Sequence, residues 1–183
     1  MDDSKRTLYG DLLVRYLACN KLKIHNNELV FCYNEFGKPF LKNYSDFHFN
    51  ISHSGVWVVC AISKKKVGID IEQMKWIDLD IAKRFFSESE YKMLMSQPEY
   101  ARTEYFYNLW TLKESYIKCV GKGLPIPLNH FSISFDDHLI SIVPTTSPAM
   151  YFSQIFLDNE YKLSVCSEVN NLYCKIILIN III

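Results

Sequence analysis

The six residues from Val67 to Glu72 combine an apolar repeat with two carboxylates. In an extended strand successive side chains point to opposite faces, so Asp70 and Glu72 would share one face, with their Cα atoms roughly 6–7 Å apart. Two anionic oxygen donors on one face form half of a site for a hard divalent cation. Gly68 lies on the same face and would leave room there for a ligand. The alternative is a strand with one solvated polar face.

A second set of chemical side chains lies on a long helical pattern. Trp110, Glu114 and Lys118 recur at i, i+4 and i+8, so they would share one helix face. Glu114 is the natural third ligand for the cation, and Lys118 would neutralise phosphoryl oxygens one turn away. The alternative is a surface ion pair between Glu114 and Lys118, worth about 0.3–0.5 kcal/mol.

A third set is a small polar turn, Asn50 to Gly55, which follows a short strand. Ser52, His53 and exposed backbone N–H groups at such a turn can hold a phosphate. A hairpin turn with self-capping serines is the alternative.

Helices and strands alternate in blocks around these residues. The pattern at Ser87–Glu90 is a capping box that starts a helix, and Gly121 ends the longest helix. We predict helices over 4–19 with Ser4 as N-cap, over 79–85, after residue 87, and over 99–120. We predict strands over 29–33, 47–52, 56–62, 67–72, 131–135, 139–143, 150–157, 161–167 and in the apolar tail, 172–183.

Composition bounds the class of protein. The 183 residues are 49% hydrophobic, which fits a globular fold, and 20 basic residues balance 20 acidic ones. This balance argues against a field that attracts nucleic acid or an anionic membrane. Six cysteines without a C-x-x-C pair, and an N-terminus without a signal-peptide core, favour the cytoplasm. The apolar tail is too short for a spanning helix.

Four segments, taken in order, resemble the Sfp-type 4′-phosphopantetheinyl transferases, and the similarity extends from about Arg6 to Cys166. The segments are Gly37-Lys38-Pro39, Phe49-Asn50-Ile51-Ser52-His53-Ser54-Gly55, Val67-Gly68-Ile69-Asp70-Ile71-Glu72, and Trp110-Thr111-Leu112-Lys113-Glu114-Ser115-Tyr116-Ile117-Lys118.

The resemblance implies transfer of the phosphopantetheine arm of coenzyme A to a serine of an acyl or peptidyl carrier protein, with release of adenosine 3′,5′-bisphosphate. It implies Mg²⁺ as cofactor and coenzyme A as co-substrate. Asp70, Glu72 and Glu114 would hold Mg²⁺, Glu114 would also be the base, and Lys118, with Lys113 beside it, would neutralise the phosphate. Lys38 and Pro39 would lie near the adenine; Arg6, Thr7, Ser52 and His53 would contact phosphates; Met74, Trp76 and Ile77 would contact the carrier.

The resemblance also implies an α+β fold of two similar halves, 1–74 and 75–183, and we expect a monomer. Relatives normally carry a few dozen residues before Arg6, so we expect an incomplete first half here. A non-catalytic remnant that binds the carrier protein is therefore an alternative. A metal-dependent nuclease is a second alternative, and the neutral charge and lack of a basic stripe disfavour it.

Overall fold

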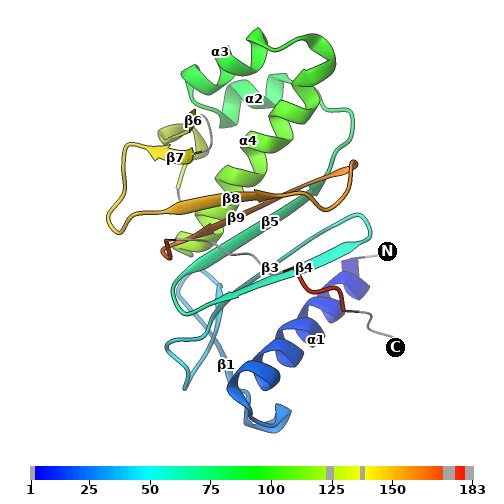
Figure 1. The fold of residues 1–183 in the computed structure, drawn as a ribbon, viewed down its shortest axis with the longest axis vertical. Coiled ribbons are helices and arrows are strands. Elements are labelled where there is room, and N and C mark those ends of the chain that lie inside the picture. Colours follow the sequence, from blue (N-terminus) through cyan, green and yellow to red (C-terminus); the bar gives the residue numbers. More distant parts are fainter. Residues whose placement is uncertain (1–2, 123–125, 137–138, 171–175, 180–183) are drawn as a thin grey trace.

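The computed structural model describes residues 3–122, 126–136, 139–170 and 176–179. Two long helices, α1 and α4, each lie against a set of antiparallel strands, and the two layers meet along β3 and β5 (Figure 1). The structure therefore mixes helices and sheets in an α+β arrangement, as the sequence predicts.

The first half is built on α1 (Asp3–Leu22), which packs against the antiparallel pair β3 (His48–Ser54) and β4 (Trp57–Ser63). Helix α1 turns Val14 and Ala18 inward, and β3 contributes Phe49 to the same core. A short 3₁₀ helix (Asn26–Glu28) and the pair β1 (Phe31–Tyr33) and β2 (Pro39–Leu41) close the lower end of this half in Figure 1.

The second half is built on α4 (Glu99–Val120), which lies across a three-stranded antiparallel sheet of order β5-β9-β8. Helix α4 places Phe106, Leu109 and Leu112 in a core shared with α2 and α3. The elements are β5 (Val67–Gln73), α2 (Asp80–Phe85), α3 (Glu88–Ser96), the 3₁₀ helix Leu128–His130, the pair β6 (Ser132–Asp136) and β7 (Leu139–Val143), β8 (Tyr151–Ile155) and β9 (Tyr161–Ser167).

Several predicted boundaries are confirmed. Helix α4 spans 99–120 and ends at Gly121, whose φ of 75° is the left-handed conformation that glycine adopts at a helix C-terminus. The capping box is present, because the Ser87 hydroxyl accepts from the Glu90 backbone N–H and the Glu90 carboxylate accepts from that of Ser87. Ser4 lies inside α1 and is not its N-cap. Most of the predicted tail strand lies outside the described residues, and 176–179 are not in a strand.

Gly68 has a different role from the one expected. A Cβ atom there would lie 2.0 Å from the Ser115 carbonyl oxygen and 2.3 Å from the Cys119 backbone nitrogen. The space beside Gly68 is therefore filled by the backbone of α4, not by a ligand, and the glycine lets the helix approach β5 closely.

Strand β5 connects the two halves. It pairs by backbone hydrogen bonds with β9 of the second half, while its other edge faces β3 of the first half. The division of the chain at residue 74 stays a prediction, since β5 makes contacts on both sides.

Candidate active site

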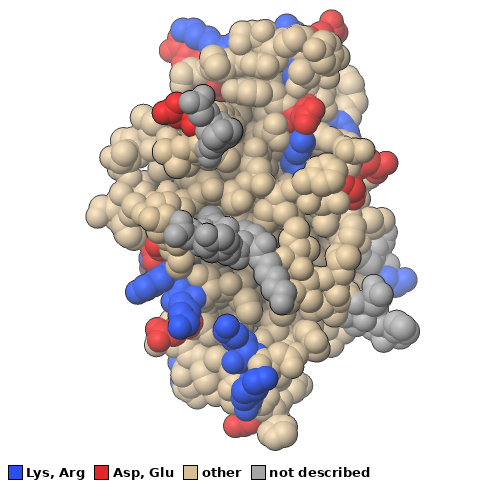
Figure 2. Space-filling model, in the orientation of Figure 1, with Lys and Arg blue, Asp and Glu red and all other residues tan. Residues whose placement is uncertain are grey.

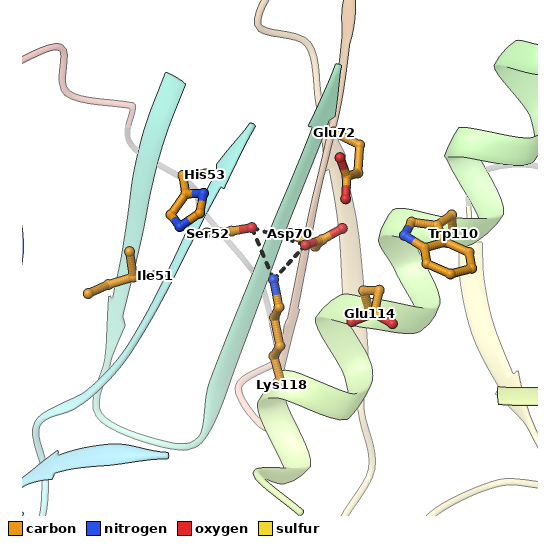
Figure 3. Close-up of a pocket in the computed structure, with 8 residues that line it drawn as sticks. All are labelled: Ile51, Ser52, His53, Asp70, Glu72, Trp110, Glu114 and Lys118. Carbon is orange, nitrogen blue, oxygen red and sulfur yellow. Dashed lines mark hydrogen bonds and ion pairs between the residues drawn. The ribbon is translucent and has the colours of Figure 1, made fainter. Parts of the chain in front are cut away.

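One cavity of about 320 Å³ lies where β3, β5 and α4 meet. Strand β5 contributes Asp70 and Glu72, since residues two apart share a face. Helix α4 contributes one face to the opposite wall, because residues four apart lie one above the other. The lining comprises Ile51, Ser52 and His53 from β3, Asp70 and Glu72 from β5, and Trp110, Glu114 and Lys118 from α4 (Figure 3). Three sets of residues found separately in the sequence thus line one cavity.

The centre of the cavity is a hydrogen-bonded cluster of Ser52, Asp70 and Lys118. The Lys118 ammonium lies 2.6 Å from Oδ1 of Asp70 and donates to the Ser52 hydroxyl at 3.0 Å. Ser52 in turn donates to the same Asp70 oxygen at 3.0 Å (Figure 3). Lys118 therefore pairs with a carboxylate 48 residues away in the chain, rather than with Glu114 one turn back on its own helix.

All three carboxylic acids of the cavity have a raised pKa. Burial is the main cause for Asp70, and the Lys118 charge opposes it. Burial followed by repulsion from Asp70 raises the pKa of Glu72 and of Glu114. The site therefore concentrates negative charge that one lysine neutralises only in part.

This donor set fits a hard divalent cation. Oδ2 of Asp70 is buried and has no hydrogen-bond partner among the described residues, and such an atom normally has one. As they stand, no three His, Cys, Asp or Glu side chains of the described residues enclose a metal ion by themselves. Mg²⁺ does not require such a cage, because it commonly binds one or two carboxylates and completes its shell with water and substrate phosphates.

Comparisons with known proteins agree with this chemistry. A model described as the 4′-phosphopantetheinyl transferase superfamily matches residues 66–169, and one described as 4′-phosphopantetheinyl transferase, N-terminal, matches residues 1–65. A 4′-phosphopantetheinyl transferase of Bacillus subtilis is 46% identical over 168 residues, which cover 91% of this chain and 75% of that protein. The chain belongs to the 4′-phosphopantetheinyl transferase superfamily.

One further relative supports the assignment, and one solved structure shares the fold. The 4′-phosphopantetheinyl transferase gsp of Aneurinibacillus migulanus is 45% identical over 168 residues, covering 90% of this chain and 69% of that protein. The crystal structure of a holo-(acyl-carrier-protein) synthase from Bacillus anthracis, in complex with CoA (3′,5′-ADP), aligns with a TM-score of 0.50 at 22% identity. That alignment covers 56% of this chain and 93% of the synthase, and it shows a shared fold.

The structure corrects the expected position of Lys113. Its side chain is fully buried away from the cavity, where it forms an ion pair with Glu90 at 2.7 Å and donates to the Phe131 carbonyl at 2.6 Å. Consecutive helix residues are about 100° apart, so Lys113 cannot share the face of Glu114 and Lys118. Lys113 is therefore buried outside the cavity, and its part in catalysis stays a prediction.

Four predicted nucleotide contacts do not line the cavity. Arg6 donates to the Gly55 carbonyl at 3.1 Å, and Thr7 is exposed on α1. Lys38 donates to the carbonyls of Val67 at 3.1 Å and of Lys118 at 2.5 Å, near the end of α4. Pro39 is the first residue of β2. Their roles toward a nucleotide stay predictions, and only Ser52 and His53 of this set line the cavity.

The three predicted carrier contacts differ in exposure. Met74 and Ile77 pack against the core of the second half, whereas Trp76 is 88% exposed. Only the tryptophan is therefore largely open to a partner, and its contact with a carrier protein stays a prediction.

A second cavity, about 440 Å³ in volume, lies in the first half between α1, the loop after β2, and β4. Lys21 and Lys64 lie at this cavity, and Asp46 is the one acidic residue among the described residues that line it, which therefore provide no paired carboxylates like those of the first cavity. Basic side chains gather over the lower half of the face in Figure 2, where the first half lies.

Within the described residues, no helix combines the length and apolar character that crossing a bilayer requires.

Proposed function

We propose that this chain transfers the 4′-phosphopantetheine arm of coenzyme A to a serine hydroxyl of an apo acyl or peptidyl carrier protein. The products would be the holo-carrier and adenosine 3′,5′-bisphosphate. The observation that carries the proposal is the cavity in which three carboxylates and one lysine converge, in a chain of this superfamily.

The reaction exchanges one phosphoester bond for another. The carrier serine oxygen would form a bond to the phosphorus that carries the pantetheine arm. The bond between that phosphorus and the bridging oxygen of the pyrophosphate would break, and its electron pair would leave with the adenosine bisphosphate. The serine proton would pass to a base, directly or through one water.

Two residues of α4 would act on the reacting groups. Glu114 would accept the serine proton, directly or through one water, because its carboxylate lines the cavity beside Asp70 and Glu72. Lys118 would neutralise charge on the transferring phosphoryl group and the leaving group, which is where phosphoryl transfer gains most from a fixed cation. Ser52 and His53 would contact phosphate oxygens at the β3 side of the cavity.

Asp70, Glu72 and Glu114 would hold Mg²⁺, whose bound charge would neutralise the pyrophosphate oxygens. The partnerless Oδ2 of Asp70 supports this assignment, since that oxygen lacks a donor in the present arrangement.

The test is the intact mass of an apo peptidyl carrier protein after incubation with this chain, coenzyme A and Mg²⁺. The carrier should gain one phosphopantetheine, and EDTA should prevent the gain. The Glu114→Gln variant should lower the rate about 100-fold or more, which is the usual effect of removing a general base. Lys118→Met should also lower turnover with little change in carrier binding.

The matched control is Glu104→Gln, which changes an exposed glutamate of the same helix that pairs with Lys162. Its rate should equal that of the parent chain. No mass gain with the parent, beside an active relative, would contradict the proposal and favour the non-catalytic remnant. An unchanged rate for Glu114→Gln would refute the assigned base.

A further inference from the structure

Three polar side chains of β3 bind three backbone amides of β5 in one register. Oδ1 of Asn50 accepts from the Ile69 N–H at 2.8 Å. The Ser52 hydroxyl accepts from the Ile71 N–H at 3.3 Å, and the Ser54 hydroxyl accepts from the Gln73 N–H at 3.0 Å. Each acceptor lies 19 residues before its donor. We call Asn50, Ser52 and Ser54 the side-chain ladder.

The side-chain ladder stands where a backbone ladder would be in a continuous sheet. Strand β3 pairs through its backbone with β4, and β5 pairs with β9, but among the described residues no backbone pairing joins β3 to β5. Residues two apart on β3 share a face, and alternate amides of β5 point to one edge, so the two periodicities match. The side-chain ladder therefore provides hydrogen-bond acceptors for the backbone N–H groups on the edge of β5 that faces β3.

The same hydroxyls also bind the carboxylates of the cavity. A serine hydroxyl has one proton, and a hydroxyl that accepts from a backbone N–H can direct that proton elsewhere. Ser52 donates to Oδ1 of Asp70 at 3.0 Å, and Ser54 donates to Oε2 of Glu72 at 3.0 Å. Ser52 and Lys118 both bind Oδ1 of Asp70, so Oδ2 of the same carboxylate remains without a hydrogen-bond donor among the described residues.

We propose that Ser54 is a positioning residue that fixes the direction of the Glu72 carboxylate toward the cation. This inference rests on the proposed function, because it concerns the same site. A hydrogen bond to a ligating carboxylate restrains its rotation, and losing such a bond typically costs about 10–100-fold in metal affinity. Ser54 gives a sharper test than Ser52, because Ser54 does not line the cavity and is not an assigned phosphate contact.

The experiment compares Ser54→Ala and Ser54→Thr with the parent chain. Binding of Mn²⁺, a spectroscopic substitute for Mg²⁺, is measured by electron paramagnetic resonance with coenzyme A present. Ser54→Ala should raise the Kd for Mn²⁺ about 10-fold. It should raise the Mg²⁺ concentration for half-maximal rate similarly, and kcat at saturating Mg²⁺ should stay near the parent value. Ser54→Thr keeps the hydroxyl and should restore binding.

The matched control is Ser164→Ala on β9, the strand at the other edge of β5. Ser164 is fully buried, and its hydroxyl bonds Thr111 at 2.7 Å rather than a carboxylate. This variant should lose stability while its Mn²⁺ affinity stays at the parent value. Unchanged affinity in Ser54→Ala, failure of threonine to restore it, or an equal loss in Ser164→Ala would overturn the positioning role. If the parent binds no Mn²⁺ while Asp70→Asn behaves identically, the metal site itself is wrong.

Discussion

Glu90 accepts hydrogen bonds from three parts of the second half at once. Its two oxygens accept from the Lys113 ammonium at 2.7–2.8 Å, from the Ile133 backbone N–H at 2.7 Å and from the Ser87 backbone N–H at 2.9 Å. One side chain thus joins α4, β6 and the start of α3. Burial lowers the pKa of Lys113, and Glu90 opposes this effect.

Replacing Lys113 with methionine would leave the Glu90 carboxylate buried without its charge partner. We expect Lys113→Met to lower the free energy of unfolding by about 3–5 kcal/mol, as for other broken buried ion pairs. Urea denaturation measures this loss. Lys92→Met, which removes a largely exposed ion pair with Glu88, is the control and should change stability little. A drop in turnover at unchanged stability would instead restore Lys113 to the catalytic set.

At the scale of elements, the contact between β5 and α4 determines whether the carboxylates and Lys118 meet. Gly68 makes this contact possible, because the backbone of α4 occupies the position of its missing side chain. Lys38 reinforces it from the first half through carbonyls of both elements.

We expect Gly68→Ala to destabilise the chain by about 3 kcal/mol or more, since the clash is with backbone atoms that cannot rotate away. Thermal unfolding measures the change. Gly10→Ala is the matched control, because its Cβ would lie 3.1 Å from a methyl group of Ile51, and alanine favours the helix by up to about 1 kcal/mol. Similar unfolding temperatures for the two variants would show that α4 can move away from β5.

The elements were easier to predict from sequence than the contacts between them. Helix α4 follows from a long pattern between Pro98 and Gly121, and the alternation around Asp70 and Glu72 identifies β5. Local spacing suggested that Lys118 pairs with Glu114, but its partner Asp70 comes from a distant strand. The predicted turn from Asn50 to Gly55 is wrong, because β3 continues to Ser54 and pairs with β4 throughout. Asn50, Ser52 and Ser54 alternate along that strand, and only the approach of β3 to β5 shows what they bind.

At the scale of the whole molecule, the cavity opposes stability. Glu72 has a raised pKa because of burial and repulsion from Asp70, so its charged form destabilises the folded state. The folded chain binds this proton more tightly than the unfolded chain. The stabilisation from protonating Glu72 is therefore complete below its ordinary pKa of 4.5 and is lost as pH rises through the raised pKa of the folded state.

We expect Glu72→Gln to be more stable than the parent at neutral pH without metal, with an advantage that disappears as pH falls toward about 4.5. Mg²⁺ with coenzyme A should stabilise the folded parent more than the folded variant, because the variant lacks the Glu72 carboxylate that would bind the cation. Urea denaturation from about pH 4 to pH 8 tests both statements. A parent that is more stable than Glu72→Gln at every pH without metal would contradict them.

The side-chain ladder has a further consequence for how the molecule opens. Alternate amides of a strand point to opposite edges, so the amides of Ile69, Ile71 and Gln73 face β3 while those between them face β9. Separation of the two halves would expose the first set to solvent and leave the second set paired. Hydrogen exchange at neighbouring residues of β5 would then report two different motions, parting of the halves and unfolding of the second sheet. Amide exchange within the single strand β5 would therefore distinguish these two motions.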